Sequence, residues 1–588
     1  MYSAPLLEQS FVLQTIGKLS QTPSCSAIDP GADDIVEAVL SEAGRLAREV
    51  FEPLCRRGDL EGARWENGSV SLPEGFLEAY QQYRDGGWAS LHAHPDHGGQ
   101  GLSFALSCAV QEQLTSANMA FALCMMLSQG AIHALSNHAS SELQLRYLGR
   151  LVSGEWTGTM NLTEPQAGTD VGALRTQAVP EAAGRYRISG EKIFITWGDH
   201  DVAANIVHLV LARLPGAPAG TKGISLFLVP KYLVNDDGTL GDKNDVSCRS
   251  LERKLGIHAS PTCTMQFGAE GNCFGWLIGQ ENKGLAAMFA MMNHARINVG
   301  LQGVAIAERS YQRSVAYAFE RQQHGSLIAT FPDVRRMLMT MRANTQAARA
   351  LVYYTASQVD WAAAASGPEE RWHFNCRADL LTPVAKSWAT DLGVATTSIG
   401  IQVLGGLGYI EDSGAAQDFR DARIAPIYEG TNGIQAIDLV TRKLDADCGK
   451  HWGLLFAEIG EALDHAERDT ALQSTVAALR TGHDAVVRST LWLTNTAAIS
   501  PDLRQSAAAP YLQIFGNLIG GWLLLVQAEA ALGGLHSADF DREFLEAKVA
   551  TAKFFAEQIV APQAAISSAL VLAGSKDYRL SKEQMISR

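Results

Sequence analysis

The sequence predicts an α+β protein of several domains, in which a β-rich segment lies between helical ones. Apolar residues recur at helical spacing before and after the middle of the chain. Between these parts, short runs rich in β-branched and aromatic residues are separated by Gly, Pro, Asn and Asp. These runs are Tyr186–Ser189, Lys192–Thr196, Ile206–Leu211, Ile224–Val229 and Cys263–Phe267.

A chain of 588 residues has room for about three or four domains. The changes of pattern divide it into an N-terminal extension, an N-terminal helical domain, a middle β domain, a helical bundle with the candidate catalytic residue, and an additional C-terminal helical domain. The expected boundaries are 1–30, 31–155, 156–284, 285–445 and 446–588.

Composition excludes some classes of function and favours one cellular location. A net charge of -14 and a pI near 5.6 oppose a surface that tracks nucleic-acid phosphates. The nine cysteines are scattered without metal-ligand spacing, so we expect reduced, mostly buried thiols. No secretory signal is visible and the first arginine is Arg45, which favours a cytoplasmic protein.

The longest apolar stretch, Tyr511–Val526, is interrupted by Gln513 and Asn517. It is shorter than the span of about twenty residues that crosses a bilayer. We therefore expect a buried or interfacial helix and no transmembrane segment.

His92, His94 and His97 gather in a glycine-rich loop, but their spacing and the lack of a matching carboxylate favour a solvated loop over a metal site.

Glu429 is the candidate general base. It follows apolar Ile427 and Tyr428, precedes Gly430, and leads into a segment of helical periodicity, so it should lie at or just before a helix start. A carboxylate among apolar neighbours has a raised pKa, which suits removal of a proton from carbon near neutral pH. The alternative is a first-turn glutamate that only complements the helix dipole.

Four segments carry a resemblance to a known family: Leu162–Asp170, Lys192–Thr196, Gln402–Tyr409 and the Tyr-Glu-Gly-Thr box at residues 428–431. Their types and order resemble the acyl-CoA dehydrogenase family over about residues 35 to 445. The C-terminal helical region resembles an addition found in larger members. No Gly-x-Gly-x-x-Gly or Walker-type motif occurs, so a dinucleotide has to be held in another way.

The resemblance implies FAD as cofactor, lying between the β domain and the helical bundle with its flavin ring beside the catalytic glutamate. It assigns to FAD the residues Met160, Leu162, Thr163, Gly168, Thr169, Phe194, Thr196, Arg321, His324, Gln402, Gly405, Gly406 and Thr431. It assigns to the substrate Asn293, Arg296, Tyr428 and Gly430. No metal is implied.

This chain departs from the family pattern at three of these places. Phe194 stands where many members have Trp, and Asn293 where others often have Asp. Gly433 replaces a Gln, which puts one contact on the adenine side in doubt.

Arg296 and Arg321 are 25 residues apart on what the pattern predicts as one helix, Leu285–Gln322. At 1.5 Å per residue they are about 37 Å apart, so they cannot serve one site in one subunit. If both serve cofactor or substrate, Arg321 reaches a neighbour's flavin. We therefore expect a homo-oligomer, at least a dimer.

The expected reaction is α,β-dehydrogenation of an acyl-CoA thioester to the trans-2-enoyl-CoA, in fatty acid β-oxidation or related catabolism, with medium- to long-chain substrates favoured. An electron-transferring flavoprotein is the expected acceptor. Three alternatives stay open: a dehydrogenase for 3-methylmercaptopropionyl-CoA, an acyl-CoA oxidase that passes electrons to oxygen, and a non-catalytic flavin-binding protein of the same fold.

Overall fold

The computed structural model describes residues 2–17, 32–495, 500–535, 540–573 and 580–586. These residues form two compact units. The first comprises residues 2–6, 32–313 and 404–424, and the second comprises the rest. The predicted architecture is confirmed: helices precede a middle β domain, and further helices follow it to the C-terminal region.

The first unit begins with helices. They are α2 (Ala32–Leu46), α3 (Glu52–Glu61), α4 (Phe76–Asp85), α5 (Phe104–Ala117), α6 (Met119–His138) and α7 (Ser141–Val152). A short hairpin, β1 (Arg64–Glu66) with β2 (Ser69–Ser71), interrupts this helical part and was not predicted. The helix α11 (Ala415–Ala422) returns to the first unit after the bundle.

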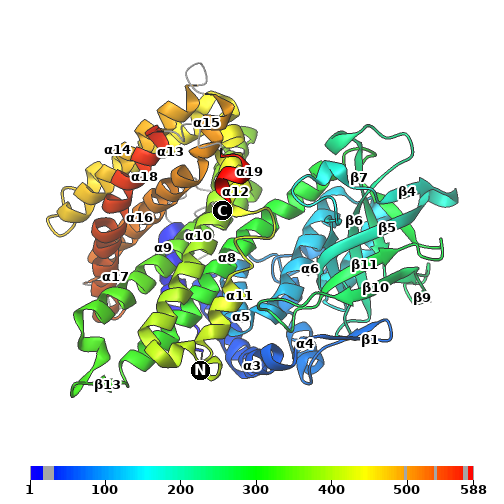
Figure 1. The fold of residues 1–588 in the computed structure, drawn as a ribbon, viewed down its shortest axis with the longest axis horizontal. Coiled ribbons are helices and arrows are strands. Elements are labelled where there is room, and N and C mark those ends of the chain that lie inside the picture. The colour runs from blue at the N-terminus through cyan, green and yellow to red at the C-terminus, as the bar shows by residue number, and fades with distance from the viewer. Residues whose placement is uncertain (1, 18–31, 496–499, 536–539, 574–579, 587–588) are drawn as a thin grey trace. The chain divides into compact units, whose positions relative to one another are not determined.

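In the described residues, an eight-stranded sheet forms the middle of the first unit (Figure 1). Its path is β10 (Val246–Leu251), β11 (Thr262–Phe267), β5 (Arg185–Thr196), β12 (Phe274–Ile278), β7 (Ile224–Pro230), β6 (Asn205–Arg213) and β3 (Trp156–Asn161), with β4 (Gln177–Pro180) beside β5 and β6. All five β runs expected from the sequence lie in these strands. A separate hairpin pairs β8 (Tyr232–Val234) with β9 (Leu240–Lys243).

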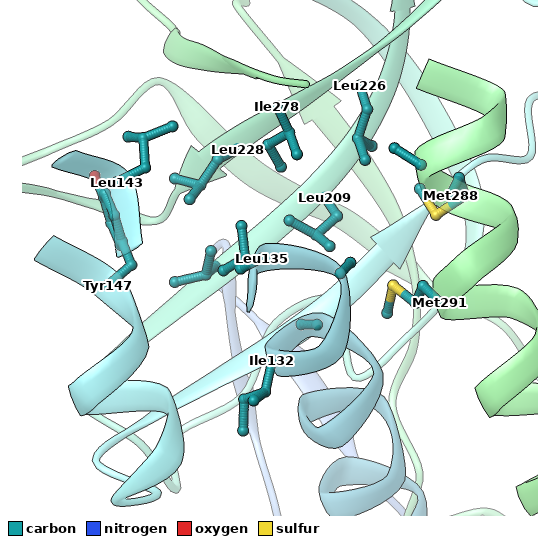
Figure 2. Packing of buried hydrophobic residues seen from close by; sticks show 14 of the residues in the cluster. Ile132, Leu135, Leu143, Tyr147, Leu209, Leu226, Leu228, Ile278, Met288 and Met291 are labelled. Atoms are coloured by element: carbon teal, nitrogen blue, oxygen red, sulfur yellow. The ribbon is translucent and has the colours of Figure 1, made fainter. Parts of the chain in front are cut away.

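One face of this sheet is covered by helices. Leu209, Leu226 and Ile278 of the sheet pack with Ile132 of α6 and Met291 of α8 (Gly284–Ala318), as Figure 2 shows. Strands β6 and β7 are buried along almost their whole length, so they read as continuous apolar runs rather than as alternating ones. Met160 and Leu162, two of the candidate flavin residues, pack against this core at the end of β3.

The second unit is helical. Its elements are α1 (Leu6–Gly17), α9 (Pro332–Ala364), α10 (Pro368–Leu404), α12 (Asn432–Asp438), α13 (Lys450–Ala466), α14 (Gln473–Thr494), α15 (Pro501–Ser506), α16 (Ala508–Gly534), α17 (Arg542–Phe555), α18 (Ala561–Ala573) and α19 (Lys582–Met585). Helices α8 and α10 each contribute to both units. Within the C-terminal region, α14, α16 and α18 pack against one another (Figure 1).

The N-terminal helix is fastened into the second unit by a buried charge network. Glu8 accepts hydrogen bonds from Lys548 (2.8 Å) and Gln346 (3.0 Å). Burial raises the pKa of Glu8, but the Lys548 and Arg349 charges outweigh burial and hold it below its ordinary value. The extension expected at residues 1–30 thus contributes, through α1, to the core of the helical unit.

Four helical segments of the described chain are long and apolar enough to cross a membrane by length and composition alone. They are Met119–His138, Pro368–Tyr409, Ala508–Gly534 and Arg542–Leu572. In the first and third, 78% of the most apolar window is buried inside the protein, against 39% in the other two. The expectation that the stretch at 511–526 is too short for a span is wrong, because α16 extends beyond it at both ends. Its predicted burial is confirmed, whereas the absence of a transmembrane segment stays a prediction.

Eight of the nine cysteines lie in the described residues, and all eight are free thiols. Six of them are buried, as expected. Cys25 lies outside the described residues.

Candidate active site

Glu429 lies in a tight turn just ahead of α12, as predicted. Its φ is +56°, and Gly430 follows with φ of +84°. For a residue with a side chain, this left-handed conformation costs about 1 to 3 kcal/mol, and it persists only where the surroundings enforce it. The turn then ends at Thr431, whose hydroxyl caps α12 by accepting a bond from the Ile434 N–H (3.4 Å).

A buried lysine holds this turn. Lys386, in the middle of α10, donates one hydrogen bond to the Gly430 carbonyl (2.9 Å) and another to Asn432 Oδ1 (2.8 Å). The amide nitrogen of Asn432 donates back to α10, at the Ser387 carbonyl (3.0 Å) and at Asp391 Oδ1 (2.8 Å). The turn that carries Glu429 is therefore tied to α10 on both sides of the Thr431 cap.

Lys386 and Asn432 are not among the site residues predicted from the sequence. A signal was present, because Lys386 stands in an apolar stretch of a helix between Val384 and Trp388, and a cation on a buried face needs partners. The same reasoning had identified Arg296.

Arg296 and Asn293 are brought together on α8. Arg296 is buried and its Nη1 donates to Asn293 Oδ1 (3.2 Å), while its guanidinium lies 5.7 Å from the centre of the Phe289 ring. This aromatic contact partly replaces the water that a buried guanidinium loses. The pair presents a fixed positive charge with a polar neighbour, a combination that suits an anionic or carbonyl-bearing ligand.

The residues expected beside the flavin ring gather where β3 ends. Met160 and Leu162 pack against the core shown in Figure 2 and remain half-buried. The Thr163 carbonyl accepts a bond from the Ile193 N–H (2.9 Å), which brings this loop beside the end of β5. Thr196 occupies the last position of that strand.

The end of β5 has an unusual backbone. Phe194 has φ of +59° and Trp197 has φ of +54°, so two aromatic residues adopt left-handed conformations around Thr196. The Phe194 side chain is 58% exposed, although an aromatic ring in a strand usually packs inward.

The loop after β3 is open at Gly168. An added Cβ at this exposed position would meet no atom within 4 Å. An open loop beside an outward-facing ring and a half-buried apolar floor fits a flat aromatic cofactor with a phosphate tail.

A buried ion pair joins the two walls of this region. Lys192 of β5 donates to Glu164 Oε1 (2.8 Å) and to the Leu162 carbonyl (3.0 Å). Glu164 also accepts from the Thr176 hydroxyl (2.6 Å). Burial alone would raise the pKa of Glu164. The Lys192 charge and the hydrogen bonds outweigh burial and lower this pKa to about 2. Both residues lie inside the segments that resemble the family, Leu162–Asp170 and Lys192–Thr196, but neither was predicted to have a role.

The remaining cofactor candidates are exposed in the described chain: Thr169, Arg321, His324, Gln402, Gly405, Gly406 and Thr431. The expectation that Arg321 lies on the same long helix as Arg296 is wrong, because α8 ends at Ala318. Arg321 opens a hairpin of β13 (Gln322–Gln323) and β14 (Ser326–Leu327). The helix stops there because His324 and Gly325, with φ of +50° and +74°, form the tight turn that such a hairpin needs.

The glycine-rich histidine loop is only partly solvated. His94 is exposed, but His92 is half-buried and lies in a stack of rings with Phe104 and His294 of α8. Among the described residues, no group of three or more His, Cys, Asp or Glu side chains is placed to hold a metal ion.

We predict that Glu164→Gln destabilises the first unit by about 3 to 5 kcal/mol at neutral pH, because it leaves the buried Lys192 ammonium without its counter-charge. The pKa of Glu164 is depressed from 4.5 to about 2, so its contribution to stability is complete above pH 4.5 and disappears as the pH falls through about 2. Chemical unfolding from pH 7 to pH 2 measures this change.

The control is Glu191→Gln. Glu191 is exposed on β5, the strand that carries Lys192, and its replacement should change stability by less than about 0.5 kcal/mol. An equal, pH-independent effect of both variants would contradict the prediction.

The chain matches four family models in order. Residues 36–155 match the acyl-CoA dehydrogenase N-terminal domain, 159–269 the middle domain and 282–444 the C-terminal domain. Residues 455–579 match a domain described as acetyl-CoA dehydrogenase C-terminal like.

Similar proteins extend over nearly the whole chain. It is 45% identical to the 3-methylmercaptopropionyl-CoA dehydrogenase of Ruegeria pomeroyi, over 95% of this chain and 96% of that protein. It is 35% identical to the broad-specificity linear acyl-CoA dehydrogenase FadE5 of Mycobacterium tuberculosis, over 90% of each. Among solved structures, an acyl-CoA dehydrogenase complexed with FAD from Bacillus anthracis shares the fold with a TM-score of 0.72 at 22% identity, over 96% of this chain and 88% of that one. With all four domain matches in order and this full-length identity, the chain belongs to the acyl-CoA dehydrogenase family.

Proposed function

We propose that this protein uses FAD to remove two hydrogens from Cα and Cβ of an acyl-CoA thioester, with Glu429 as the base. One observation carries the assignment of the base: a half-buried glutamate held in a left-handed turn by hydrogen bonds from a buried lysine on another helix. Strain of this kind gathers at functional sites. A glutamate that served only the helix dipole would need no such turn, because it would lie in the first turn of α12 with ordinary helical angles.

In this reaction the Glu429 carboxylate takes the α-proton, and the β-hydrogen leaves with its electron pair. FAD, when bound, supplies the acceptor of that hydride. The Glu429 backbone N–H polarises the thioester carbonyl and so stabilises the enolate character that develops as the α-proton leaves. Tyr428 and Gly430 flank the base and line the same turn. The raised pKa expected for Glu429 remains part of the proposal.

Arg296 and Asn293 are the proposed substrate contacts on α8. Their hydrogen bond orients the guanidinium, so that binding the substrate does not have to order it. Met160, Leu162, Thr163, Phe194 and Thr196 are the proposed floor and edge of the flavin site. Gly168 and Thr169 are proposed to approach the pyrophosphate, because only a small residue allows the backbone close to a phosphate.

Among acyl groups, we favour 3-methylmercaptopropionyl-CoA. The support is the 45% identity to an enzyme named for that substrate, without large gaps at either end. Its α- and β-carbons are ordinary methylenes, so the same proton and hydride removal yields a thioether-substituted enoyl thioester. The thioether is soft and polarisable and makes favourable contacts with aromatic rings.

The single experiment that tests the substrate is anaerobic flavin bleaching with a panel of acyl-CoAs. Pentanoyl-CoA is the matched control, because a methylene replaces the sulfur with almost no change of shape. We expect kcat/KM to be highest for 3-methylmercaptopropionyl-CoA and to fall for octanoyl- and palmitoyl-CoA. Faster bleaching by the long chains would favour the second candidate, a medium- to long-chain fatty acyl-CoA dehydrogenase, which the 35% identity to a broad-specificity linear enzyme supports.

An electron-transferring flavoprotein is the proposed electron acceptor, and a cytoplasmic location agrees with that partner. An acyl-CoA oxidase would use the same base and cofactor but pass electrons to oxygen. Reoxidation of the substrate-reduced enzyme in air separates the two: slow reoxidation supports the dehydrogenase, and rapid formation of hydrogen peroxide supports the oxidase.

Glu429→Gln should retain the fold and bound flavin but slow flavin reduction by about two to four orders of magnitude, because an amide of almost the same shape cannot accept the α-proton. Stopped-flow bleaching and exchange of substrate α-protons with deuterium oxide measure the loss. Acyl-CoA affinity should change far less. A variant that bleaches at nearly the wild-type rate would show that another group is the base, or that the flavin site is not catalytic.

The exposed residues Arg321, His324, Gln402, Gly405 and Gly406 are proposed to contact the flavin of a second subunit. Two features support this: Arg321 lies beyond the far end of the helix that carries Arg296, and the segment Gly405–Tyr409 exposes large apolar side chains, with Tyr409 84% exposed. The proposed assembly is at least a dimer.

Mixed subunits test this assembly. Arg321→Ala should lower the FAD content, and Glu429→Gln should abolish reduction, yet hybrids of the two variants should recover part of the activity. In a hybrid dimer, one of the two sites has both its own Glu429 and the neighbour's Arg321. No recovery after subunit exchange verified by mass spectrometry would contradict the shared site.

A further inference from the structure

We infer that Lys386 is a positioning residue, which aims the carboxylate of Glu429 by fixing the peptide groups that follow it. The inference rests on the proposed role of Glu429 as base. It assigns a function to a side chain 44 residues away in sequence from the turn that it holds.

Burial is the first part of the argument. Lys386 is fully buried within α10, where its ammonium has lost the water that would solvate it. A buried cation without hydrogen-bond partners is strongly unfavourable, so its oxygen partners are under a real constraint. The Gly430 carbonyl is one of them, at 2.9 Å. Since this carbonyl belongs to the peptide group between Gly430 and Thr431, the ammonium fixes the chain directly after the Glu429–Gly430 peptide and so limits how Glu429 can turn.

A second contact of Lys386 fixes the turn two residues further along the chain. Asn432 accepts from Lys386 through Oδ1 and donates through Nδ2 to the Ser387 carbonyl and to Asp391. Its own backbone N–H donates to the Pro426 carbonyl (3.0 Å) and so closes the loop around Glu429. The strained Glu429 therefore lies inside a loop closed by the Pro426–Asn432 bond, and two residues that follow it, Gly430 and Asn432, are tied to α10.

That helix is itself held in place. Trp388, two residues after Lys386, lies against Gly516 and Gly520 of α16, where an added Cβ would come within 2.4 and 2.6 Å of the indole. Its indole N–H donates to Asn517 Oδ1 (2.9 Å). Rotation of α10 that would carry Lys386 away from the turn is blocked by this contact with the C-terminal region.

The consequence concerns rate rather than affinity. Proton transfer from carbon needs the carboxylate close to the α-hydrogen and correctly aligned, and a displacement of about 1 Å can reduce the rate about 10²-fold. Without the ammonium, the turn can relax from its left-handed conformation and the Glu429 carboxylate is no longer aligned, whereas the flavin contacts proposed on β3 and β5 and the Arg296–Asn293 pair lie outside the turn and remain.

The experiment compares Lys386→Met and Asn432→Ala in the full-length FAD-loaded enzyme. The matched control is Lys443→Met, which removes another nearly buried lysine of the same unit, one whose partner is Asp379 and not the turn. We expect Lys386→Met to slow flavin bleaching about 10²-fold, with FAD content and acyl-CoA affinity close to wild type. Asn432→Ala should reduce the bleaching rate by a smaller factor. In the double variant, the rate should fall by less than the product of the two single-variant factors, because both residues act through one turn. Lys443→Met should bleach at nearly the wild-type rate.

Wild-type bleaching in Lys386→Met, or equal losses in Lys386→Met and Lys443→Met, would overturn the inference. If Lys386→Met does not retain FAD, the partly exposed Asn432 decides: an unchanged rate in Asn432→Ala overturns the inference, and a slowed rate with normal affinity supports it. Glu429→Gln is measured alongside. If that variant bleaches normally, the base assignment itself fails; if it is inactive while Lys386→Met is not, only the positioning role fails.

Discussion

A buried ammonium is the constraint around which the helical unit is arranged. Lys386 is fully buried, so the surrounding oxygens have to solvate it, and two of them belong to the turn that carries Glu429. The free energy of satisfying the cation thus opposes the strain of a glutamate with φ of +56°. The turn keeps a conformation that isolated chains avoid, and a carboxylate keeps one orientation.

The first unit, which contains the β domain, also has a buried lysine that holds a loop, but its main partner is a carboxylate. Lys192 on β5 is also fully buried, and it fastens the loop after β3 through Glu164 and the Leu162 carbonyl. Here the counter-charge is a carboxylate, which makes the link sensitive to acid through the depressed pKa of Glu164. In both units, a lysine within a regular element holds an irregular loop in place, so proposed site residues on those loops, such as Glu429 and Thr163, are positioned by a helix or a strand.

The C-terminal helical region supports this arrangement rather than standing apart from it. Helix α16 packs against α12 and α9, and its glycines accept the Trp388 ring of α10. Glycine weakens a helix by about 1 kcal/mol relative to alanine, so two of them at one contact indicate that close approach matters more than helix stability. The N-terminal helix joins the same core through Glu8 and Lys548.

Local sequence determined much of this protein. The order of helical and β segments, four of the strands, the burial of α16 and the position of Glu429 ahead of a helix all follow from periodicity and turn residues, which act over a few neighbours. The end of α8 was placed four residues too late, because the positive φ of His324 is a property of the hairpin and leaves no strong trace in composition.

Only the tertiary structure decided which partners the buried lysines bind. Lys386 and Gly430 are 44 residues apart, and Lys192 and Glu164 are 28 apart, so no local pattern pairs them. The left-handed turn at Glu429 likewise depends on a partner from another helix, since nothing in the residue type favours it. Sequence could name Glu429 as the proposed base from its neighbours, but what holds Glu429 in place comes from desolvation in a packed core, which exists only once distant segments have come together.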